Sequence, residues 1–490
     1  YNEWDDLAGC SNQTIFTVNS YGVEVGTYND VDECDNFTLL ANSEDGFYYL
    51  QSHMSTDAQG NPVGAAPTDA NNDGLDDIFL GGASEFASKL FIQGKNETFF
   101  ERQIEDFDTD KKHEDVSALF FDANGDDSLD LYVVSGGSEF ENASSLYQDR
   151  LYLNDGKGNF KRAPNALPNL TSSGSVVKAI DVDSDGQMDL FVGGRVVPGR
   201  YPETPRSYLL KNTNGVFSNV TTQWSDGLTN VGMVTDASFN DLDNDGVNEL
   251  ILCGEWMPIS VFKFEQGKYK NKTSNYGLDS KIGWWNSLLV EDFNNDGYVD
   301  IVAGNLGLNS FFKASTKAPL ELYYKDFDGN GSLDAVLCSY VDGISYPVVG
   351  RDRLLNQMVM LKKRFTRYDG YARATINDIF TIEELKNVKI LKANHLAHTL
   401  FTNEKGTGFK ASELPRNVQI SVLQSCSAID INNDGNIDLV TGGNFYGTDA
   451  EFGRYDASIG DVILNKGQNN LEVVPTYESG FKIPGHVCEI

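Results

Sequence analysis

The chain of 490 residues is poor in histidine, cysteine and positive charge. It contains five histidines, six cysteines and 38 Lys+Arg against 72 Asp+Glu, which gives a formal net charge of −34. Nucleic-acid binding needs a basic surface, so this balance argues against a nucleic acid as partner. No run of 18 or more apolar residues occurs, and we therefore expect no membrane-spanning helix. The hydrophobic fraction of 40% still supports a folded core rather than disorder.

The sequence motifs of several common enzyme classes are also missing. The chain has no Gly-x-Ser-x-Gly elbow, no His-Glu-x-x-His zinc motif and no phosphate-binding loop. His395 and His398 stand three residues apart in an apolar stretch, but a pair of histidines without a third ligand is a weak zinc pattern. Acidic residues are too numerous for a general acid and base to be singled out. We therefore predict no catalytic residues.

The chain has instead an acidic loop of nine residues that is repeated seven times. In the copy at 181–189, carboxylates occupy positions 1, 3, 5 and 9, and glycine occupies position 6. Calcium prefers six to eight oxygen ligands at about 2.3–2.6 Å, which alternate residues of a tight loop can supply. Glycine permits the sharp turn because it adopts positive φ at little cost. Position 7 would contribute its backbone carbonyl, and position 9 would complete the site.

Seven copies in register predict about seven calcium sites, whereas a single copy would be explained as an ordinary Asx turn. Two copies depart from the pattern. Asp127 replaces the glycine of the second loop, which predicts weaker binding there, and Glu249 replaces the closing aspartate of the fourth, which should still bind through its longer side chain. The predicted ligands at positions 1, 3, 5, 7 and 9 are Asp69, Asn71, Asp73, Leu75, Asp77; Asp122, Asn124, Asp126, Ser128, Asp130; Asp181, Asp183, Asp185, Gln187, Asp189; Asp241, Asp243, Asp245, Val247, Glu249; Asp292, Asn294, Asp296, Tyr298, Asp300; Asp326, Asp328, Asn330, Ser332, Asp334; and Asp430, Asn432, Asp434, Asn436, Asp438.

The spacing of the loops predicts an all-β fold, a seven-bladed β-propeller with calcium-binding loops. Most loops precede a short apolar run and Gly-Gly or Gly-Asn, and a second phrase at 150–160, 207–217 and 399–409 has the form of a hairpin. Such repeats cannot bury their faces alone and stack around an axis. We expect an N-terminal extension at 1–60, which also lends a strand to close the ring, and the propeller at 61–490. A small helical insertion is expected at about 350–392.

The loops, each followed by a strand and Gly-Gly, resemble FG-GAP/VCBS repeats, the calcium-loop blades also found in the propellers of integrin α-subunits. The resemblance covers about residues 65–470. The phrases at 111–116, 192–202 and 453–458 resemble those of the secreted VCBS-repeat proteins of Bacteroidota-type bacteria. The resemblance implies a binding or surface-assembly module rather than an established enzyme.

A secreted, extracellular or cell-surface location suits calcium sites of this open kind, which need calcium in the millimolar range. Cys10 and Cys34 flank a short segment and are candidates for a disulfide, whereas Cys253 and Cys338 lie in apolar runs and are expected to be buried free thiols. Seven Asn-x-Ser/Thr sequons permit the chain to be a glycoprotein in a eukaryotic secretory route. They are Asn12, Asn36, Asn96, Asn142, Asn169, Asn219 and Asn271.

The segments after the Gly-Gly strands are rich in Arg, Trp, Tyr and Asn, and they predict a recognition face at one end of the axis. The alternative is that the tryptophans only pack between blades. We expect an adhesion, recognition or extracellular assembly module whose partner is an extracellular protein, a glycan or a second copy. A polysaccharide lyase or hydrolase is the alternative, and it predicts a deep axial pocket with Arg, Tyr and carboxylates. The candidate ligand-binding residues are Arg195, Arg200, Trp256, Trp284, Trp285, Asn305, Asn444, Tyr446 and Arg454.

Overall fold

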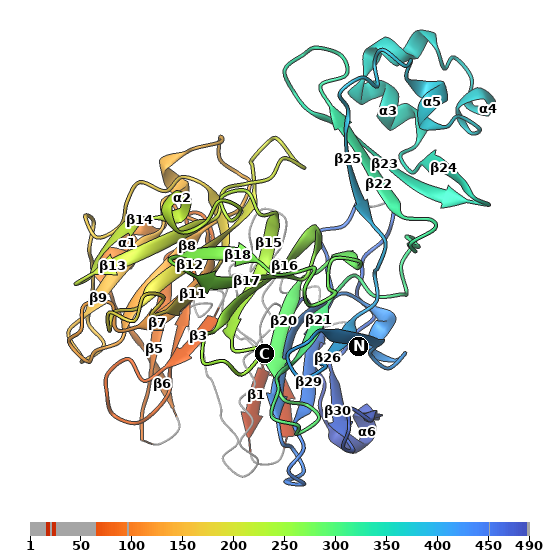
Figure 1. Cartoon of the computed structure of the whole chain (residues 1–490). Helices are drawn as coiled ribbons and strands as arrows, with labels where there is room; N and C mark the ends of the chain where they lie inside the picture. The colour runs from red at the N-terminus through yellow and green to blue at the C-terminus, as the bar shows by residue number, and fades with distance from the viewer. Residues whose placement is uncertain (1–15, 20–21, 26–64, 96–97, 450, 488–490) are drawn as a thin grey trace.

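The computed structural model describes residues 16–19, 22–25, 65–95, 98–449 and 451–487 (Figure 1). In the N-terminal part, strands β1 (Phe16–Asn19) and β2 (Gly22–Val25) pair with each other in antiparallel register. The predicted Cys10–Cys34 disulfide and most of the expected N-terminal extension lie outside the described residues. Cys253 and Cys338 are free and buried, as predicted.

Six antiparallel sheets, here numbered first to sixth, begin one after another along the chain. The first three consist of β3 (Ala65–Thr68), β4 (Asp77–Leu80), β5 (Lys89–Gln93) and β6 (Phe99–Arg102); β7 (Asp115–Phe121), β8 (Asp130–Ser135), β9 (Arg150–Asn154) and β10 (Phe160–Arg162); and β11 (Ser173–Ile180), β12 (Asp189–Val196), β13 (Tyr208–Thr213) and β14 (Val216–Asn219). The next three consist of β15 (Met233–Asn240), β16 (Glu249–Pro258), β17 (Ser260–Glu265) and β18 (Lys268–Asn271), with β19 (Ile282–Trp284) added to β16; β20 (Ser287–Glu291), β21 (Asp300–Gly304), β26 (Thr399–Asn403) and β27 (Phe409–Glu413); and β28 (Leu423–Ile429), β29 (Asp438–Gly443), β30 (Asp461–Asn465) and β31 (Leu471–Val474).

The apolar run after each acidic loop of these six sheets forms the second strand. Every residue of β8, β21 and β29 is buried, so both faces of these strands are covered. The cover comes from the neighbouring sheets. For example, Phe121 and Tyr132 of the second sheet share one apolar cluster with Leu190 and Leu210 of the third. The sheets therefore pack face to face in the order of the chain.

The first strands of the six sheets lie next to one another in succession. Contacts link β3 to β7, β7 to β11, β11 to β15, β15 to β20 and β20 to β28. This succession of small antiparallel sheets, each presenting its first strand to the next, fits the radial arrangement of a β-propeller.

A seventh large sheet is nested within the fifth. Strands β21 and β26 are hydrogen-bonded in the fifth sheet, yet residues 305–398 separate them in sequence. This insertion forms a sheet in the order β24 (Ile344–Pro347), β23 (Asp334–Val341), β22 (Leu320–Lys325), β25 (Lys389–Ala393). Figure 1 shows it extending away from the other sheets. The number of large sheets equals the predicted seven, but the loop at 326–334 belongs to this insertion and not to a successive blade. The spacing of the loops could not predict this insertion, because spacing does not show which strands pair with each other.

The helices of the described chain are short, and none is long and apolar enough to cross a membrane. Three of them occupy the insertion, where a helical stretch was expected at 350–392, and Leu354 and Leu355 are buried there as the spacing predicts. The α-helices are α1 (Glu105–Asp110), α2 (Thr221–Trp224), α3 (Arg351–Gln357), α4 (Tyr368–Tyr371), α5 (Ile376–Ile379) and α6 (Thr476–Ser479), and the 3₁₀ turns are η3 (Ser145–Tyr147), η4 (Val359–Lys363) and η5 (Val418–Ile420).

Four of the first strands contain a β-bulge near their start. In each of these strands the pairing register shifts, and one residue is left without a partner on the second strand. These residues are Val116 in β7, Ser175 in β11, Thr235 in β15 and Gln424 in β28. A bulge bends its strand and changes the direction of the extra side chain. Glycines within the second strands, or directly after them, lie opposite these bulges. In the fourth sheet a Cβ on Gly254 would lie 2.1 Å from the carbonyl oxygen of Met233. The recurring glycine therefore allows two backbones to approach closely at the bulge.

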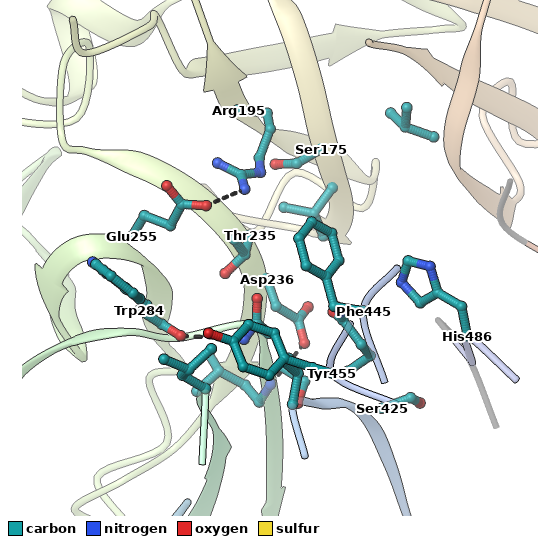
Figure 2. A pocket seen from close by; sticks show the side chains of 18 of the residues that line it. Ser175, Arg195, Thr235, Asp236, Glu255, Trp284, Ser425, Phe445, Tyr455 and His486 are labelled. Atoms are coloured by element: carbon teal, nitrogen blue, oxygen red, sulfur yellow. Dashed lines mark hydrogen bonds and ion pairs between the residues drawn. The ribbon is translucent and has the colours of Figure 1, made fainter. Parts of the chain in front are cut away.

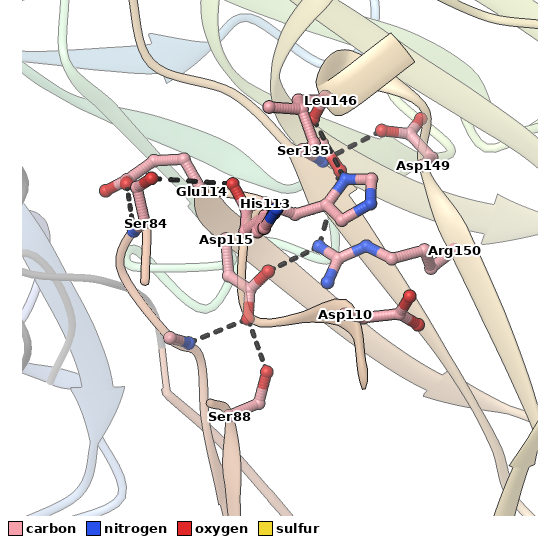
Figure 3. A network of polar contacts seen from close by, with 12 residues as sticks. Ser84, Ser88, Asp110, His113, Glu114, Asp115, Ser135, Leu146, Asp149 and Arg150 are labelled. Carbon is pink, nitrogen blue, oxygen red and sulfur yellow. Dashed lines mark hydrogen bonds and ion pairs between the residues drawn. The ribbon is translucent and has the colours of Figure 1, made fainter. Parts of the chain in front are cut away.

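A buried ionic network joins the first and second sheets beside one of these bulges (Figure 3). The Arg150 side chain is 1% exposed and forms an ion pair with Asp115, the first residue of β7. The other carboxylate oxygen of Asp115 accepts hydrogen bonds from the Gly82 N–H at 2.7 Å and the Ser88 hydroxyl at 2.6 Å. Because a buried charge needs compensation, these partners fix the position of the first sheet on the second.

Replacing Gly254 with alanine tests the requirement for close approach. The added methyl group has no room beside Met233, so we expect G254A to lower the free energy of unfolding by about 1–3 kcal/mol and the melting temperature accordingly. The matched control is G370A in α4, where a new Cβ meets no atom within 4 Å and alanine favours the helix. Equal melting temperatures for G254A, G370A and the wild type would contradict this explanation of the glycines.

Candidate functional site

All seven acidic loops adopt the same backbone-to-carboxylate hydrogen bonding. In the first loop, Asp69 accepts from the N–H groups of Asp73 at 3.0 Å and Gly74 at 2.8 Å, and Asp73 accepts from Leu75 at 3.0 Å. The equivalent bonds from residues 5 and 6 to residue 1, and from residue 7 to residue 5, occur in the other six loops. These bonds fold each loop so that its side-chain oxygens gather on the inside of one turn.

The oxygen atoms of the loops fit a hard divalent cation such as Ca²⁺. Three loops bring carboxylate oxygens at positions 1, 3 and 9 within 4.8 Å of one another. In two loops with asparagine at position 3, the Asn71 and Asn294 Oδ1 atoms are buried without a hydrogen-bond partner, as is Asp300 Oδ2 in the second of these loops. Buried oxygen atoms without donors are costly unless a cation or water binds them. Carboxylate and amide oxygens are ligands that calcium prefers.

The closing aspartate at position 9 is buried beneath its loop. Burial raises the pKa of Asp77, Asp130, Asp189 and Asp300 to about 6, although backbone N–H groups that donate to them act in the opposite direction. A bound divalent cation would stabilise the ionised form of these carboxylates and relieve the repulsion between them and the other acidic residues of the loop.

A recurring asparagine connects each of four loops to the preceding one. In four sheets, an asparagine at or next to the end of the third strand donates its backbone N–H to the closing aspartate of the same sheet at 2.7–2.9 Å. These asparagines are Asn154, Asn212, Asn403 and Asn465. Their side-chain amides donate to a backbone carbonyl at position 2 of the loop in the preceding sheet. The second recurring phrase of the sequence, predicted only as a hairpin, therefore also joins neighbouring sheets.

A central cavity of about 720 Å³ lies at the other end of the same strands. It is lined from the second, third, fourth, fifth and sixth sheets, and the four bulge residues Val116, Ser175, Thr235 and Gln424 are among its lining residues. Most other polar groups of the wall are uncharged, and aromatic side chains close one side, as Figure 2 shows for Trp284, Phe445 and Tyr455. Five strand residues of about 3.3 Å each separate the loops from this cavity, so ions bound in the loops would not reach a ligand here.

Three charged groups of the cavity, Arg195, Glu255 and Asp236, are engaged with protein partners. Arg195 forms an ion pair with Glu255 (Figure 2), and the Tyr201 hydroxyl donates to the second oxygen of Glu255 at 3.2 Å. Both carboxylate oxygens of Asp236 accept backbone N–H groups, from Ala237 and from Leu288 of the fifth sheet, each at 2.8 Å. Burial raises the pKa of Asp236, although Lys178 lowers it. Neither carboxylate therefore has an oxygen without a protein donor, which limits its use as a general acid or base.

The predicted ligand-binding residues fall into three groups. Arg195 and Trp284 line the cavity, and Trp256 supports it by stacking edge-to-face on Trp284 and donating its indole N–H to the Tyr201 hydroxyl at 2.7 Å. Arg200, Tyr446 and Arg454 are not among the lining residues; Arg200 pairs with Glu203, and Arg454 lies over the Tyr446 ring. The third group is buried and makes contacts within the fold: Trp285, Asn305 and Asn444. For Trp285 this agrees with the alternative that a tryptophan only packs in the core.

Sequence reasoning missed Tyr201, Asp236 and Glu255, as well as the four bulge residues. The only available signal was indirect. The Gly-Gly or Gly-x pair within or directly after the second strand marks the position opposite the bulge; the bulge residues lie on the preceding strand, whereas Glu255 lies on the second strand itself. No local motif marks those positions.

His395 and His398 are held by hydrogen bonds within the fold. The Nδ1 atom of His398 accepts the Asn305 N–H at 2.9 Å, and its Nε2 atom lies 2.9 Å from the Ser421 carbonyl oxygen, to which it donates. His395 Nε2 lies 2.7 Å from the Thr399 hydroxyl. Because both nitrogens of His398 are used, no lone pair remains for a metal. Burial lowers the pKa of both histidines to about 4.

Comparison with known proteins identifies the repeat. A model of the FG-GAP-like repeat matches residues 122–192 and 241–303, and each matched segment spans two consecutive acidic loops. No curated protein sequence matches the chain. Among solved structures, similarity is found to BBS1N in complex with ARL6DN (10% identity, TM-score 0.38, 89% of this chain and 87% of that chain). It is also found to an arginine-substituted mutant of AofleA from Arthrobotrys oligospora (10% identity, TM-score 0.36, 87% and 95%).

The neutral state of His398 predicts a loss of stability in acid. Its pKa is about 4 in the folded chain and about 6.5 when unfolded, so its contribution is complete above pH 6.5 and is lost as the pH falls towards 4. At pH 5 the loss is about 2 kcal/mol. We expect the melting temperature of H398Q, measured in saturating calcium, to fall less than that of the wild type between pH 7 and pH 5. Parallel falls would contradict the assignment of a neutral His398.

Proposed function

We propose that this FG-GAP repeat β-propeller protein is stabilised by calcium and binds a neutral, hydroxyl-rich ligand, such as part of a glycan, in its central cavity. The observation that carries the proposal is the convergence of uncharged hydrogen-bonding side chains from several sheets on one cavity. Ser175, Thr235, Asn286, Gln424 and Ser425 all line it. Hydroxyl and amide groups can donate to and accept from sugar hydroxyls in many arrangements.

The aromatic wall supports the same ligand class. Trp284 and Tyr455 line the cavity together with Phe312 and Phe445. Binding sites for small ligands are lined mainly by apolar and aromatic side chains, with a few polar groups that set the orientation. A sugar ring presents apolar C–H faces between its hydroxyl groups, and a wall of aromatic rings beside uncharged polar groups complements both.

A binding role is favoured over catalysis by the state of the acidic residues. Glu255 is held by Arg195 and Tyr201, and Asp236 is held by two backbone N–H groups. A polysaccharide hydrolase needs one carboxyl group that can give up a proton and a second that acts as base or nucleophile. The cavity contains Arg, Tyr and carboxylate side chains, which the polysaccharide enzyme also predicts, but the Glu255 and Asp236 carboxylates are engaged in structural contacts.

An extracellular role in adhesion or recognition, with calcium bound in the acidic loops, completes the proposal. The sequons at Asn142, Asn169, Asn219 and Asn271 are exposed, so their positions suit glycosylation in a secretory route. Calcium concentrations outside cells suit open loops of this type. Self-assembly into an extracellular structure remains compatible with a ligand site at the centre of the ring.

The proposal is tested by screening the purified, calcium-loaded chain on an array of neutral and acidic oligosaccharides. We expect binding to neutral oligosaccharides without release of product. Binding would be followed for the best oligosaccharide by titration calorimetry, where Q424A should weaken the affinity about tenfold, equivalent to about 1.4 kcal/mol. The control is Q223A in α2, which is exposed and does not line the cavity.

Three outcomes would count against the proposal. Failure to bind any oligosaccharide would reject the ligand class, and equal affinities for Q424A and Q223A would reject the cavity as the site. Shortening of a bound oligosaccharide over time would favour the polysaccharide enzyme.

A further inference from the structure

The fourth acidic loop is occupied by a lysine side chain. Lys263 of β17 is 9% exposed, and its Nζ atom lies 2.8 Å from Asp243, 2.8 Å from Asp245 and 2.7 Å from Glu249. These carboxylates stand at positions 3, 5 and 9 of the loop, and they are three of the five groups predicted to bind calcium there. The ammonium thus lies among the oxygens that a metal ion would need.

The position of Lys263 is set by strand register. In the fourth sheet Leu250 pairs with Phe262, which places Lys263 opposite the closing residue Glu249. The same register position in four other sheets holds an uncharged residue, respectively Ile92, Leu153, Thr402 and Leu464. The third sheet has Lys211 there, but Lys211 forms ion pairs with Asp183 and Asp185, and its side chain is 28% exposed. Only in the fourth sheet does a lysine also reach the closing carboxylate.

Two further differences accompany Lys263. The fourth loop is closed by Glu249 and not by aspartate, and its longer side chain bonds the Leu242 N–H at 2.8 Å while its other oxygen reaches the ammonium. The residue after Lys263 is Phe264, where four other sheets have the asparagine that binds the closing aspartate. Phe264 keeps a backbone N–H, but it lacks the side-chain amide that joins the other four sheets to the preceding loop.

The chemistry of the ammonium matches this role. An ammonium group has three donors and no acceptor; that of Lys263 donates to both oxygens of Asp243 at 2.8 Å and forms ion pairs with Asp245 and Glu249. Three carboxylates lie 2.7–2.8 Å from the Lys263 ammonium, and such close opposite charges favour its charged form. A divalent cation at the same place would be repelled by the ammonium at short range, and the buried lysine stem restricts its withdrawal.

We propose that Lys263 is the resident cation of the fourth loop and that this loop binds no calcium. The loop then keeps its shape at any calcium concentration, while the loops without a lysine depend on the free ion. The expectation that Glu249 would close a calcium site through a longer side chain is replaced by an internal ion pair. The chain would accordingly bind at most six calcium ions, one fewer than the number of acidic loops.

The test is a count of bound calcium by elemental analysis, after equilibration with saturating calcium and removal of the free ion. Lys263→Met removes the charge, keeps the approximate length of the side chain and adds no oxygen ligand. We expect K263M to bind one more calcium ion per chain than the wild type. The matched control is K268M on β18, whose ammonium contacts Asp226 and lies outside the loop, and which should bind the wild-type number. Equal counts for K263M and K268M would overturn the proposal.

A second measurement on the wild-type chain covers the case in which K263M does not fold. The rate at which an amine-acetylating reagent modifies each lysine can be followed by peptide mass spectrometry in saturating calcium. If the ammonium stays in the loop, Lys263 should react at least about tenfold more slowly than Lys268. Comparable rates would mean that calcium displaces the lysine, and the proposal would be wrong.

Discussion

The rest of the structure depends on the closing carboxylate at position 9 of each acidic loop. Asp189, the first residue of β12, shows the arrangement: it is 1% exposed, one oxygen accepts the Val182 N–H of its own loop, and the other accepts the N–H of Asn212 on the neighbouring strand β13. The Asn212 side chain then bonds the preceding loop. A single buried carboxylate thus fixes the loop, the third strand and the contact to the preceding sheet, and a buried charge of this kind needs compensation by a cation or by hydrogen bonds.

The opposite ends of the same strands form the central cavity. Glycines such as Gly254 let the backbones approach closely, and the bulges opposite them place residues such as Thr235 in the cavity wall. The loops and the cavity are therefore separate: one end of each sheet joins it to its neighbours, and the other end contributes side chains to the cavity wall. In the proposed function, calcium would stabilise the ring and take no part in contacts with the ligand.

The sequence was sufficient for the repeat and for the strands, because the spacing of Asp, Asn and Gly reflects local loop geometry and the apolar runs reflect burial. It was insufficient wherever distant segments meet. The pairing of β21 with β26 across 305–398 leaves no local signal, nor does the bulge that brings Gln424 into the cavity. Nothing in the local sequence distinguishes Lys263 from other strand residues, because only the pairing register places it opposite Glu249. The sequence also predicted binding residues that the structure buries. Trp285 and Asn305 are of residue types that suit a binding site, but both are buried and make contacts within the fold.

The most direct test of this account is thermal unfolding of the chain with saturating calcium and with excess chelator. Each calcium ion that binds only the folded chain raises the free energy of unfolding by an amount that grows with the logarithm of the free calcium concentration. The contributions of several loops add, so the total effect should be large. The account predicts that the chelator lowers the melting temperature by about 10 °C or more. An unchanged melting temperature would mean that the acidic loops are turns held by their own hydrogen bonds, and the central claim would fail.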